Sequence, residues 1–251
     1  MRGLIIIIVL SLLVPCCAPS VASSQVGHET ALWMWTVAAD HHDPVVQVSM
    51  DTGSGTGIII YVDRDKPTKK GFEGYCLTAY HVVEQDNGRR SISVTYRNGR
   101  VAQNCKVMAF DKELDVAIIW VWVPEHIEPA PMADTIARAG DSLEFTGLGG
   151  GSRLSCCLRH FSAKAAAPTN ENTIYADAAL LPGDSGGPVF NDRKELVGII
   201  SGGWFWWDGG VTTSLGSSIK ATWPARACNV GAIQRLVNKI QRIRIKALAL
   251  R

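Results

Sequence analysis

Short apolar runs separated by turn residues follow one another along most of the chain. In the first half they occupy residues 45–48, 58–62, 74–78, 91–96, 106–110 and 116–123. In the second half they occupy residues 143–146, 173–178, 188–190, 196–201 and 216–220. The runs are rich in β-branched and aromatic residues and are bounded by Gly, Asp, Asn or Pro, as strands are. This pattern predicts an all-β fold of barrels or sandwiches.

The connections between the runs predict how the strands are grouped. Asn98-Gly99 separates two runs and is a strong signal for a hairpin turn. Residues 130–140 are rich in Ala and contain Pro131, which predicts a connection between two halves. We therefore expect one half over residues 45–130 and a second over residues 131–228.

Helical spacing appears at the C-terminal end of the chain. Apolar residues recur at Ile233, Leu236, Ile240 and Ile243, with Arg and Lys between them. This spacing predicts a basic amphipathic helix over residues 229–251. A basic amphipathic helix can bind an anionic membrane, but such a terminal helix more often packs its apolar stripe onto its own domain, so we favour docking.

The overall composition is that of a globular protein with no electrostatic preference for nucleic acid. Of 251 residues, 47% are hydrophobic and 19% charged, and the formal net charge is only +2. A charge so close to zero excludes a dominant electrostatic interaction with nucleic acid. The sequence has no C-x-x-C or His-x-x-x-His spacing, so we expect no metal site and no cofactor.

The N-terminal residues have the layout of a secretory signal. Arg2 precedes an apolar run over residues 4–14, and the small residues Ser20 and Ala22 suit cleavage after residue 22. This layout predicts a signal peptide over residues 1–22, a polar extension over 23–44, and export to the periplasm or the medium.

The cysteines leave a second possibility for that segment. Cys16 and Cys17 allow a lipoprotein, although Pro15 is a poor residue directly before a lipidated cysteine. Cleavage after residue 22 would leave five cysteines, an odd number, so at least one is free or pairs with another chain.

The most conspicuous stretch for chemistry is residues 181–190, where a serine stands among three glycines and two prolines. Glycine allows backbone angles closed to other residues, and proline fixes φ. The stretch can display Ser185 as a nucleophile with backbone N–H groups around it. It can equally be a tight turn before a strand, because Gly, Pro, Asp and Ser are also common turn residues.

A nucleophilic serine needs a base and a group that orients the base. Of the six histidines, His81 ends a strand-like run at 76–80, where a strand can hold its ring rigidly. Asp115 leads an apolar strand, and a carboxylate carried toward the interior needs a hydrogen-bond partner. An imidazole N–H would be such a partner. Taken alone, each residue has a purely structural explanation as well.

Taken together, the three signals carry a resemblance. The runs 76–81, 114–118 and 183–188 resemble the His, Asp and Ser signatures of chymotrypsin-like serine proteases, in that family's order and with separations of 34 and 70 residues. Residues 53–58 and 177–183 are similar to the HtrA/Deg group of exported proteases. The resemblance implies two six-stranded antiparallel β-barrels with the site in the cleft between them, and the α-helix predicted above would follow the second barrel. The sequence departs from the HtrA/Deg pattern in one respect, because no PDZ-like region follows residue 228.

The resemblance also implies a role for each matching residue. Catalysis would use Ser185 as nucleophile, His81 as general base and Asp115 as the acid that orients it. The N–H groups of Gly183 and Ser185 would form the oxyanion hole. Substrate polypeptide would lie against Ser201, Gly202 and Gly203, and Ala179 matches the floor of the specificity pocket. An alanine there implies no preference for Lys or Arg, and a small or medium aliphatic residue at the cut.

Two departures from the family pattern favour an alternative, a catalytically silent protein that binds peptides or a partner. Tyr80 is bulky for the position before the histidine. No Ile-Val-Gly-Gly activation site precedes His81. Asp184 therefore has no new N-terminus to pair with, and its partner is not evident from the sequence.

Two further readings stay open in the sequence. Asp51-Thr52-Gly53 and Asp184-Ser185-Gly186 together mimic the paired motifs of aspartic proteases, a remote alternative. The cluster Trp204-Phe205-Trp206-Trp207 could grip a partner or belong to the core. The sequence indicates no oligomeric state.

Overall fold

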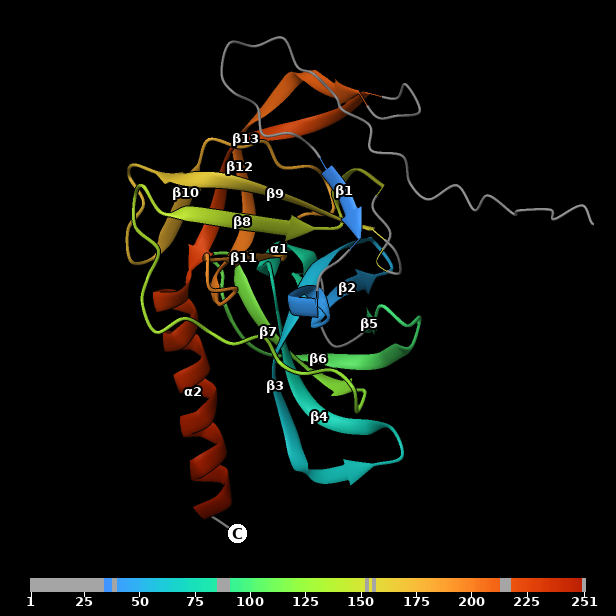
Figure 1. The fold of residues 1–251 in the computed structure, drawn as a ribbon. Helices are drawn as coiled ribbons and strands as arrows, with labels where there is room; N and C mark the ends of the chain where they lie inside the picture. The colour runs from blue at the N-terminus through green and yellow to red at the C-terminus, as the bar shows by residue number, and fades with distance from the viewer. Residues whose placement is uncertain are drawn as a thin grey trace, which may run out of the picture.

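The computed structural model describes residues 34–37, 40–84, 91–151, 154, 157–212 and 218–249. The predicted signal peptide lies outside these residues. Two six-stranded antiparallel β-barrels form most of the described chain, which confirms the predicted fold class. The barrels are stacked one on the other, and a long C-terminal helix runs beside them (Figure 1).

The first barrel closes in the strand order β2-β3-β4-β7-β6-β5. Its strands are β2 (Val45–Met50), β3 (Gly53–Thr68), β4 (Gly71–Thr78), β5 (Ile92–Thr95), β6 (Val101–Asp111) and β7 (Val116–Val123). The chain turns between β5 and β6 at Asn98-Gly99, as predicted, and Gly99 has a φ of 81°. A one-turn helix, α1 (Tyr80–Val83), follows β4 directly.

The second barrel closes because β8 pairs with both β9 and β11, which gives the order β8-β9-β10-β13-β12-β11. Its strands are β8 (Ser142–Gly147), β9 (Cys157–Ala166), β10 (Thr173–Ala176), β11 (Pro188–Phe190), β12 (Leu196–Thr212) and β13 (Ser218–Asn229). Strand β1 (Met34–Val37) pairs with β9 outside the barrel. The β12–β13 hairpin projects beyond the barrel (Figure 1). Short 3-10 turns η1 (Asp40–His42) and η2 (Gly149–Gly151) precede β2 and follow β8.

Strand β9 was not predicted, because its inward side carries a charge. Leu158, Arg159 and Phe161 are all buried, so the expected alternation of apolar and polar residues is broken. A buried arginine in a strand is rare unless it is paired, and a search for apolar alternation does not find it.

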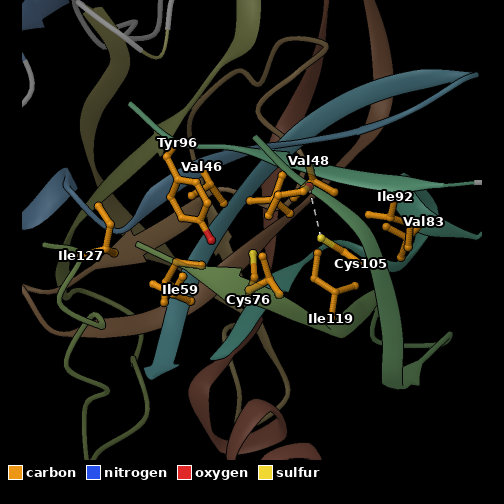
Figure 2. Close-up of a cluster of buried hydrophobic side chains, with 14 of the residues drawn as sticks. Val46, Val48, Ile59, Cys76, Val83, Ile92, Tyr96, Cys105, Ile119 and Ile127 are labelled. Atoms are coloured by element: carbon orange, nitrogen blue, oxygen red, sulfur yellow. Dashed lines mark hydrogen bonds between the residues drawn. The ribbon is translucent and has the colours of Figure 1, made fainter. Parts of the chain in front are cut away.

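Alternation along the strands divides the apolar residues among three cores. Ile59 and Cys76 point into the first barrel, while their neighbours Ile58 and Leu77 point out of it toward the second barrel and the C-terminal helix. Figure 2 shows the interior of the first barrel, where Ile59, Cys76 and Ile119 lie among residues of the surrounding strands. The interior of the second barrel is a separate cluster that includes Phe145 and Ile174.

The C-terminal helix α2 (Val230–Ala249) buries the described part of the apolar stripe predicted from its spacing, while the side chain of Ile243 is not described. Ile233, Leu236 and Ile240 pack into the core that the two barrels share. The position of α2 therefore helps to fix the barrels against each other. Across the described residues, the structure offers no helix long and apolar enough to span a bilayer.

Candidate functional site

Residues from both barrels line a cavity of about 500 Å³. It is lined by Thr52, Gly53, Ser54, His81, Val82, Leu180, Leu181, Pro182, Gly183, Ser185, Ser201, Gly202 and Gly203. The structure thus brings together most of the site residues predicted from the sequence, although they are up to 122 positions apart.

His81 is held by Asp115 through two hydrogen bonds. His81 lies on α1 rather than at the end of a strand, which corrects the expectation from the sequence. Its Nδ1 lies 2.8 Å from Asp115 Oδ2, and its backbone N–H donates to Asp115 Oδ1 at 2.9 Å. The orientation of the imidazole ring is therefore fixed, and Nε2 is the ring nitrogen that does not contact Asp115.

Asp115 is itself held from several sides. It precedes β7 with a φ of 53°, a left-handed conformation that aspartate adopts more readily than most residues. Its carbonyl accepts the N–H of Tyr80 at 3.2 Å, and its Oδ2 accepts the hydroxyl of Ser201 at 2.7 Å. Ser201 was predicted only as part of the substrate-binding edge, so its contact with Asp115 is an addition from the structure.

The contact with Asp115 changes the proton affinity of His81. The hydrogen bond to the carboxylate raises the pKa of His81 above its ordinary value of 6.5, and burial opposes the shift. A carboxylate beside an imidazole favours the charged form of the ring. The arrangement therefore suits a group that must accept a proton and hold it briefly.

Residues 181–188, here called the serine loop, begin with a type II turn. The N–H of Asp184 donates to the Leu181 carbonyl at 3.0 Å, and Gly183 has a φ of 102°. A positive φ at the third residue of a turn distinguishes type II from type I, and Pro182 suits the second position. The two types differ by a flip of the Pro182–Gly183 peptide. The N–H of Gly183 therefore points in opposite directions in the two types of turn.

The backbone N–H groups of Gly183 and Ser185 have no acceptor among the described residues, and both residues line the cavity. These donors can therefore receive an anionic oxygen there. Within the same residues, no hydrogen bond joins Ser185 Oγ to His81 Nε2. Such contacts commonly tighten only when substrate is bound.

Thr56 of the first barrel joins that barrel to the serine loop. It is fully buried, and its hydroxyl donates to the Gly183 carbonyl at 2.6 Å while accepting the N–H of Leu148 at 3.0 Å. Its backbone N–H donates to the Ser185 carbonyl at 2.8 Å. A Cβ on Gly186, which has a φ of 85°, would collide with the Thr56 carbonyl. Thr56 lies within the 53–58 motif, yet the sequence did not reveal these contacts.

Asp184 finds its cationic partner in Arg159 of β9. The two side chains form an ion pair inside the protein, with exposed fractions of 0% and 2%. Asp184 also accepts the N–H groups of Leu181 at 2.8 Å and Gly149 at 2.9 Å. No local motif indicates this pairing, because the partners are 25 residues apart on different elements.

Burial acts on both members of the pair. It lowers the pKa of Arg159 to about 10, against the opposing effect of Asp184, and it raises the pKa of Asp184, against the opposing effect of Arg159 and the backbone donors. Arg159 also donates to the Ala179 carbonyl at 2.8 Å and lies 4.4 Å from the centroid of the Phe161 ring. The guanidinium thus fixes two segments of the serine-loop region.

Two residues singled out from the sequence lie away from the cavity. The ring of Tyr80 stacks on Phe110 with 4.6 Å between centroids. Ala179 is buried and is not among the residues that line the cavity, whereas Leu180 and Leu181 line it. The bulk of Tyr80 is therefore accommodated against β6.

The paired carboxylates of an aspartic protease do not form. Asp51 is exposed at the turn between β2 and β3, whereas Asp184 is fully buried against Arg159. Two carboxylates in such different surroundings cannot share a proton.

Two expectations from the sequence fall partly or wholly outside the described side chains. The side chains of Trp204–Trp207 are not described, so their role is outside the structure. Cys76, Cys105 and Cys228 are buried free thiols, while Cys156 lies outside the described residues.

Comparison with known proteins agrees with the fold. The family model of the trypsin-like peptidase domain matches residues 55–199, more than half of the chain. The periplasmic serine endoprotease DegP of Escherichia coli is 34% identical over 150 residues, which are 58% of this chain and 29% of DegP. The chloroplastic Protease Do-like 1 of Arabidopsis thaliana is 29% identical over 161 residues, which are 59% of this chain and 32% of that protein.

Among solved structures, the serine endoprotease from Yersinia pestis superposes with a TM-score of 0.57 and 20% identity. The match covers 82% of this chain and 68% of that one, and it supports the fold alone. The chain spans about a third of the length of the two curated relatives. This chain belongs to the trypsin-like peptidase domain family, and its relatives are HtrA/Deg serine proteases.

Proposed function

We propose that this protein is an exported serine endopeptidase that uses Ser185, His81 and Asp115 through an acyl-enzyme intermediate. The observation that carries the proposal is the shared cavity of Ser185 and His81, with His81 Nδ1 bound to Asp115 at 2.8 Å. Export is supported by the signal-like layout of residues 1–22. It is also supported by the similarity to DegP, a periplasmic serine endoprotease.

In the acylation step, Ser185 Oγ attacks the peptide carbonyl carbon and its proton moves to His81 Nε2. The carbonyl oxygen becomes an oxyanion that accepts the N–H groups of Gly183 and Ser185. The C–N bond then breaks, His81 returns the proton to the leaving amine, and an ester on Ser185 remains. Water repeats the sequence on the ester: its proton passes through His81 back to Ser185 Oγ, and the carboxylic acid leaves.

Substrate binding follows from the cavity walls. Ser201, Gly202 and Gly203 line the space along the edge of β12, where an extended peptide can add as a strand. Leu180 and Leu181 line it close to Ser185. An apolar wall supports an aliphatic residue at the cleaved bond and gives no counterion for Lys or Arg.

The second candidate is the silent peptide-binding protein, and the structure weakens its two supports. Tyr80 packs on Phe110 instead of entering the cavity, and Arg159 supplies the cation that the missing activation site would have provided. All three proposed catalytic residues are also present. The enzyme therefore accounts for more of the geometry than the binder does.

Covalent labelling with a fluorophosphonate probe tests the proposed function. We expect the wild-type protein to be labelled at one residue and Ser185→Ala to lose the label completely. Ser162→Ala is the matched control, because Ser162 is an exposed serine outside the cavity, and it should label normally. A folded wild-type protein that never labels would support the silent binder.

We further propose that Thr56 is a positioning residue for the oxyanion hole. Its hydroxyl holds the Gly183 carbonyl and its N–H holds the Ser185 carbonyl, so it fixes the backbone on both sides of Asp184. It acts through these groups, without touching substrate.

Thr56→Val should lower kcat by about 10- to 100-fold with KM changed by less than about threefold, and Thr56→Ser should restore most of the rate. Valine keeps the shape but leaves the Gly183 carbonyl without its donor, so the turn loses its support. Steady-state hydrolysis of one peptide substrate supplies both constants.

Thr169→Val is the control for this experiment. The Thr169 hydroxyl also donates to a backbone carbonyl, that of Ala166 at 2.6 Å, and accepts a backbone N–H, that of Tyr175 at 3.0 Å. It lies outside the cavity lining, so its loss should affect stability and spare kcat. Equal losses of kcat in both valine variants would contradict the positioning role.

A further inference from the structure

Two neighbouring histidines and one carboxylate converge outside the catalytic cavity. The Nε2 atoms of His41 and His42 in η1 lie 2.9 Å and 2.7 Å from Glu144 Oε1 of β8. The possible ligand atoms of all three residues lie within 4.8 Å of one another. Glu144 lies 102 residues beyond His42, so the motif spacings used to exclude a metal site could not detect this cluster.

We propose that His41, His42 and Glu144 bind one divalent cation of the zinc class, with water at the fourth position. Imidazole nitrogen and carboxylate oxygen are ordinary zinc ligands, with bond lengths of about 2.0–2.2 Å. Tetrahedral ligands at that distance are separated by about 3.3 Å. The nitrogen–oxygen distances of 2.7 and 2.9 Å therefore need to open by about half an ångström, which is within the reach of side-chain rotation.

The surroundings hold the proposed ligands in place. The side chains of His41, His42 and Glu144 are only 18%, 1% and 11% exposed. The His41 ring packs edge-on against Phe190 with 5.3 Å between centroids. Thr146 Oγ1 lies 3.3 Å from His42 Nε2, and its hydroxyl would turn away when that nitrogen binds the metal. Ligands ordered before binding lose little freedom when a metal arrives.

One charge in the cluster opposes a cation. Lys194 Nζ lies 2.7 Å from Glu144 Oε2, the oxygen that the histidines do not contact. Its side chain is 46% exposed, so it can withdraw into solvent when the metal neutralises the carboxylate. The metal would then replace the lysine as the counterion of Glu144.

The location gives the site a structural role. His41 and His42 lie just before β2, the first strand of the first barrel, whereas Glu144 belongs to the second barrel and pairs with Phe190 of β11. Strand β11 follows the serine loop directly. A bound cation would therefore fasten the segment that enters the first barrel to the strands that support the serine loop.

The test uses the full chain, purified without a polyhistidine tag and freed of metal by chelation. Titration with Zn²⁺ in a calorimeter should show one equivalent bound, and Co²⁺ should give the intense visible absorption of a tetrahedral site. At zinc a hundredfold above Kd, Tm should rise by roughly 5–10 °C.

Two variants and two controls make the result specific. Glu144→Gln, which keeps an oxygen acceptor but removes the charge, and the milder His41→Asn should each weaken zinc binding at least tenfold. His126→Asn removes an exposed histidine elsewhere, and His81→Ala removes the other histidine–carboxylate pair; both should bind zinc normally.

Several outcomes would overturn the site. One is a folded wild-type protein that binds no Zn²⁺ at a concentration on the order of 100 micromolar, because a site with a Kd above that range would add little stability. Another is zinc binding that survives in His41→Asn but disappears in His81→Ala, which would assign the metal to the catalytic pair. If Glu144→Gln fails to fold, His41→Asn still decides the question, because it leaves His42 and Glu144 in place.

Discussion

Asp115→Asn should leave the fold intact and lower kcat by about four orders of magnitude. The Asp115 carboxylate accepts hydrogen bonds from the His81 backbone, the His81 ring and Ser201. An asparagine amide presents donors as well as an acceptor, so it favours the wrong tautomer of the ring and cannot stabilise the charged imidazole. Circular dichroism and steady-state kinetics on one peptide substrate measure the two effects separately.

The pH profile distinguishes this role from a structural one. The base must be neutral, so wild-type kcat/KM should rise with pH around a midpoint above 6.5, since Asp115 raises the pKa of His81. In Asp115→Asn the main cause of the shift is removed, and the midpoint should fall. The effect on stability has the opposite direction: the contribution of charged His81 is fully present below pH 6.5 and is lost as pH rises through its folded pKa.

Asp111→Asn is the matched control for the aspartate. Asp111 lies four residues earlier and accepts the backbone N–H groups of Glu113 and Leu114 in the turn before β7. We expect its kcat and its pH midpoint to remain near the wild-type values. Near-normal turnover in Asp115→Asn would show that another carboxylate orients the base.

Arg159→Met should destabilise the protein by about 3–5 kcal/mol, because it leaves the Asp184 carboxylate buried without a counterion. For a chain of this size, each 1 kcal/mol lowers Tm by roughly 2–4 °C. Asp184 then becomes protonated or leaves its position, and the backbone of Leu181 and Gly149 loses its acceptor. We therefore expect fluorophosphonate labelling to slow by about 100-fold or more, as for the loss of one oxyanion donor.

A surface arginine and a double variant complete this experiment. Arg193→Met removes an arginine whose side chain is 68% exposed, and it should change stability by less than about 0.5 kcal/mol. The double variant Arg159→Met/Asp184→Asn removes both buried charges and should recover part of the lost stability. The ion pair would have no positioning role if Arg159→Met labelled at the wild-type rate.

Local sequence pattern was sufficient for most strands and for the cluster of predicted site residues. Ile58 and Ile59, or Cys76 and Leu77, follow one another with opposite directions, as a strand between two cores requires. His81, Asp115 and Ser185 were found because each stands in its own recognisable run of residues. Their catalytic roles remain predictions for the experiments above.

The features that the sequence did not reveal depend on partners far apart in the chain. Strand β9 was missed because Arg159 occupies a buried position, and only the fold shows that Asp184 compensates its charge. The hydroxyl of Thr56 could not be assigned to the Gly183 carbonyl, 127 residues away. Similarly, no spacing rule connects His42 with Glu144. In each case a buried polar group contacts a residue that is distant in the sequence, and a local pattern of residues contains no information about such a contact.

Because Arg159 belongs to the same chain as Asp184, this ion pair affects when the serine loop can take the shape needed for the proposed catalysis. In an enzyme that must be cut to create the charged group, maturation waits for a second protease. Here the guanidinium arrives with the folding of β9, so the serine loop can take its working shape as soon as the second barrel is complete. For the exported endopeptidase proposed above, protection of the cell's own proteins during synthesis would then depend on keeping the chain unfolded until it has crossed the membrane.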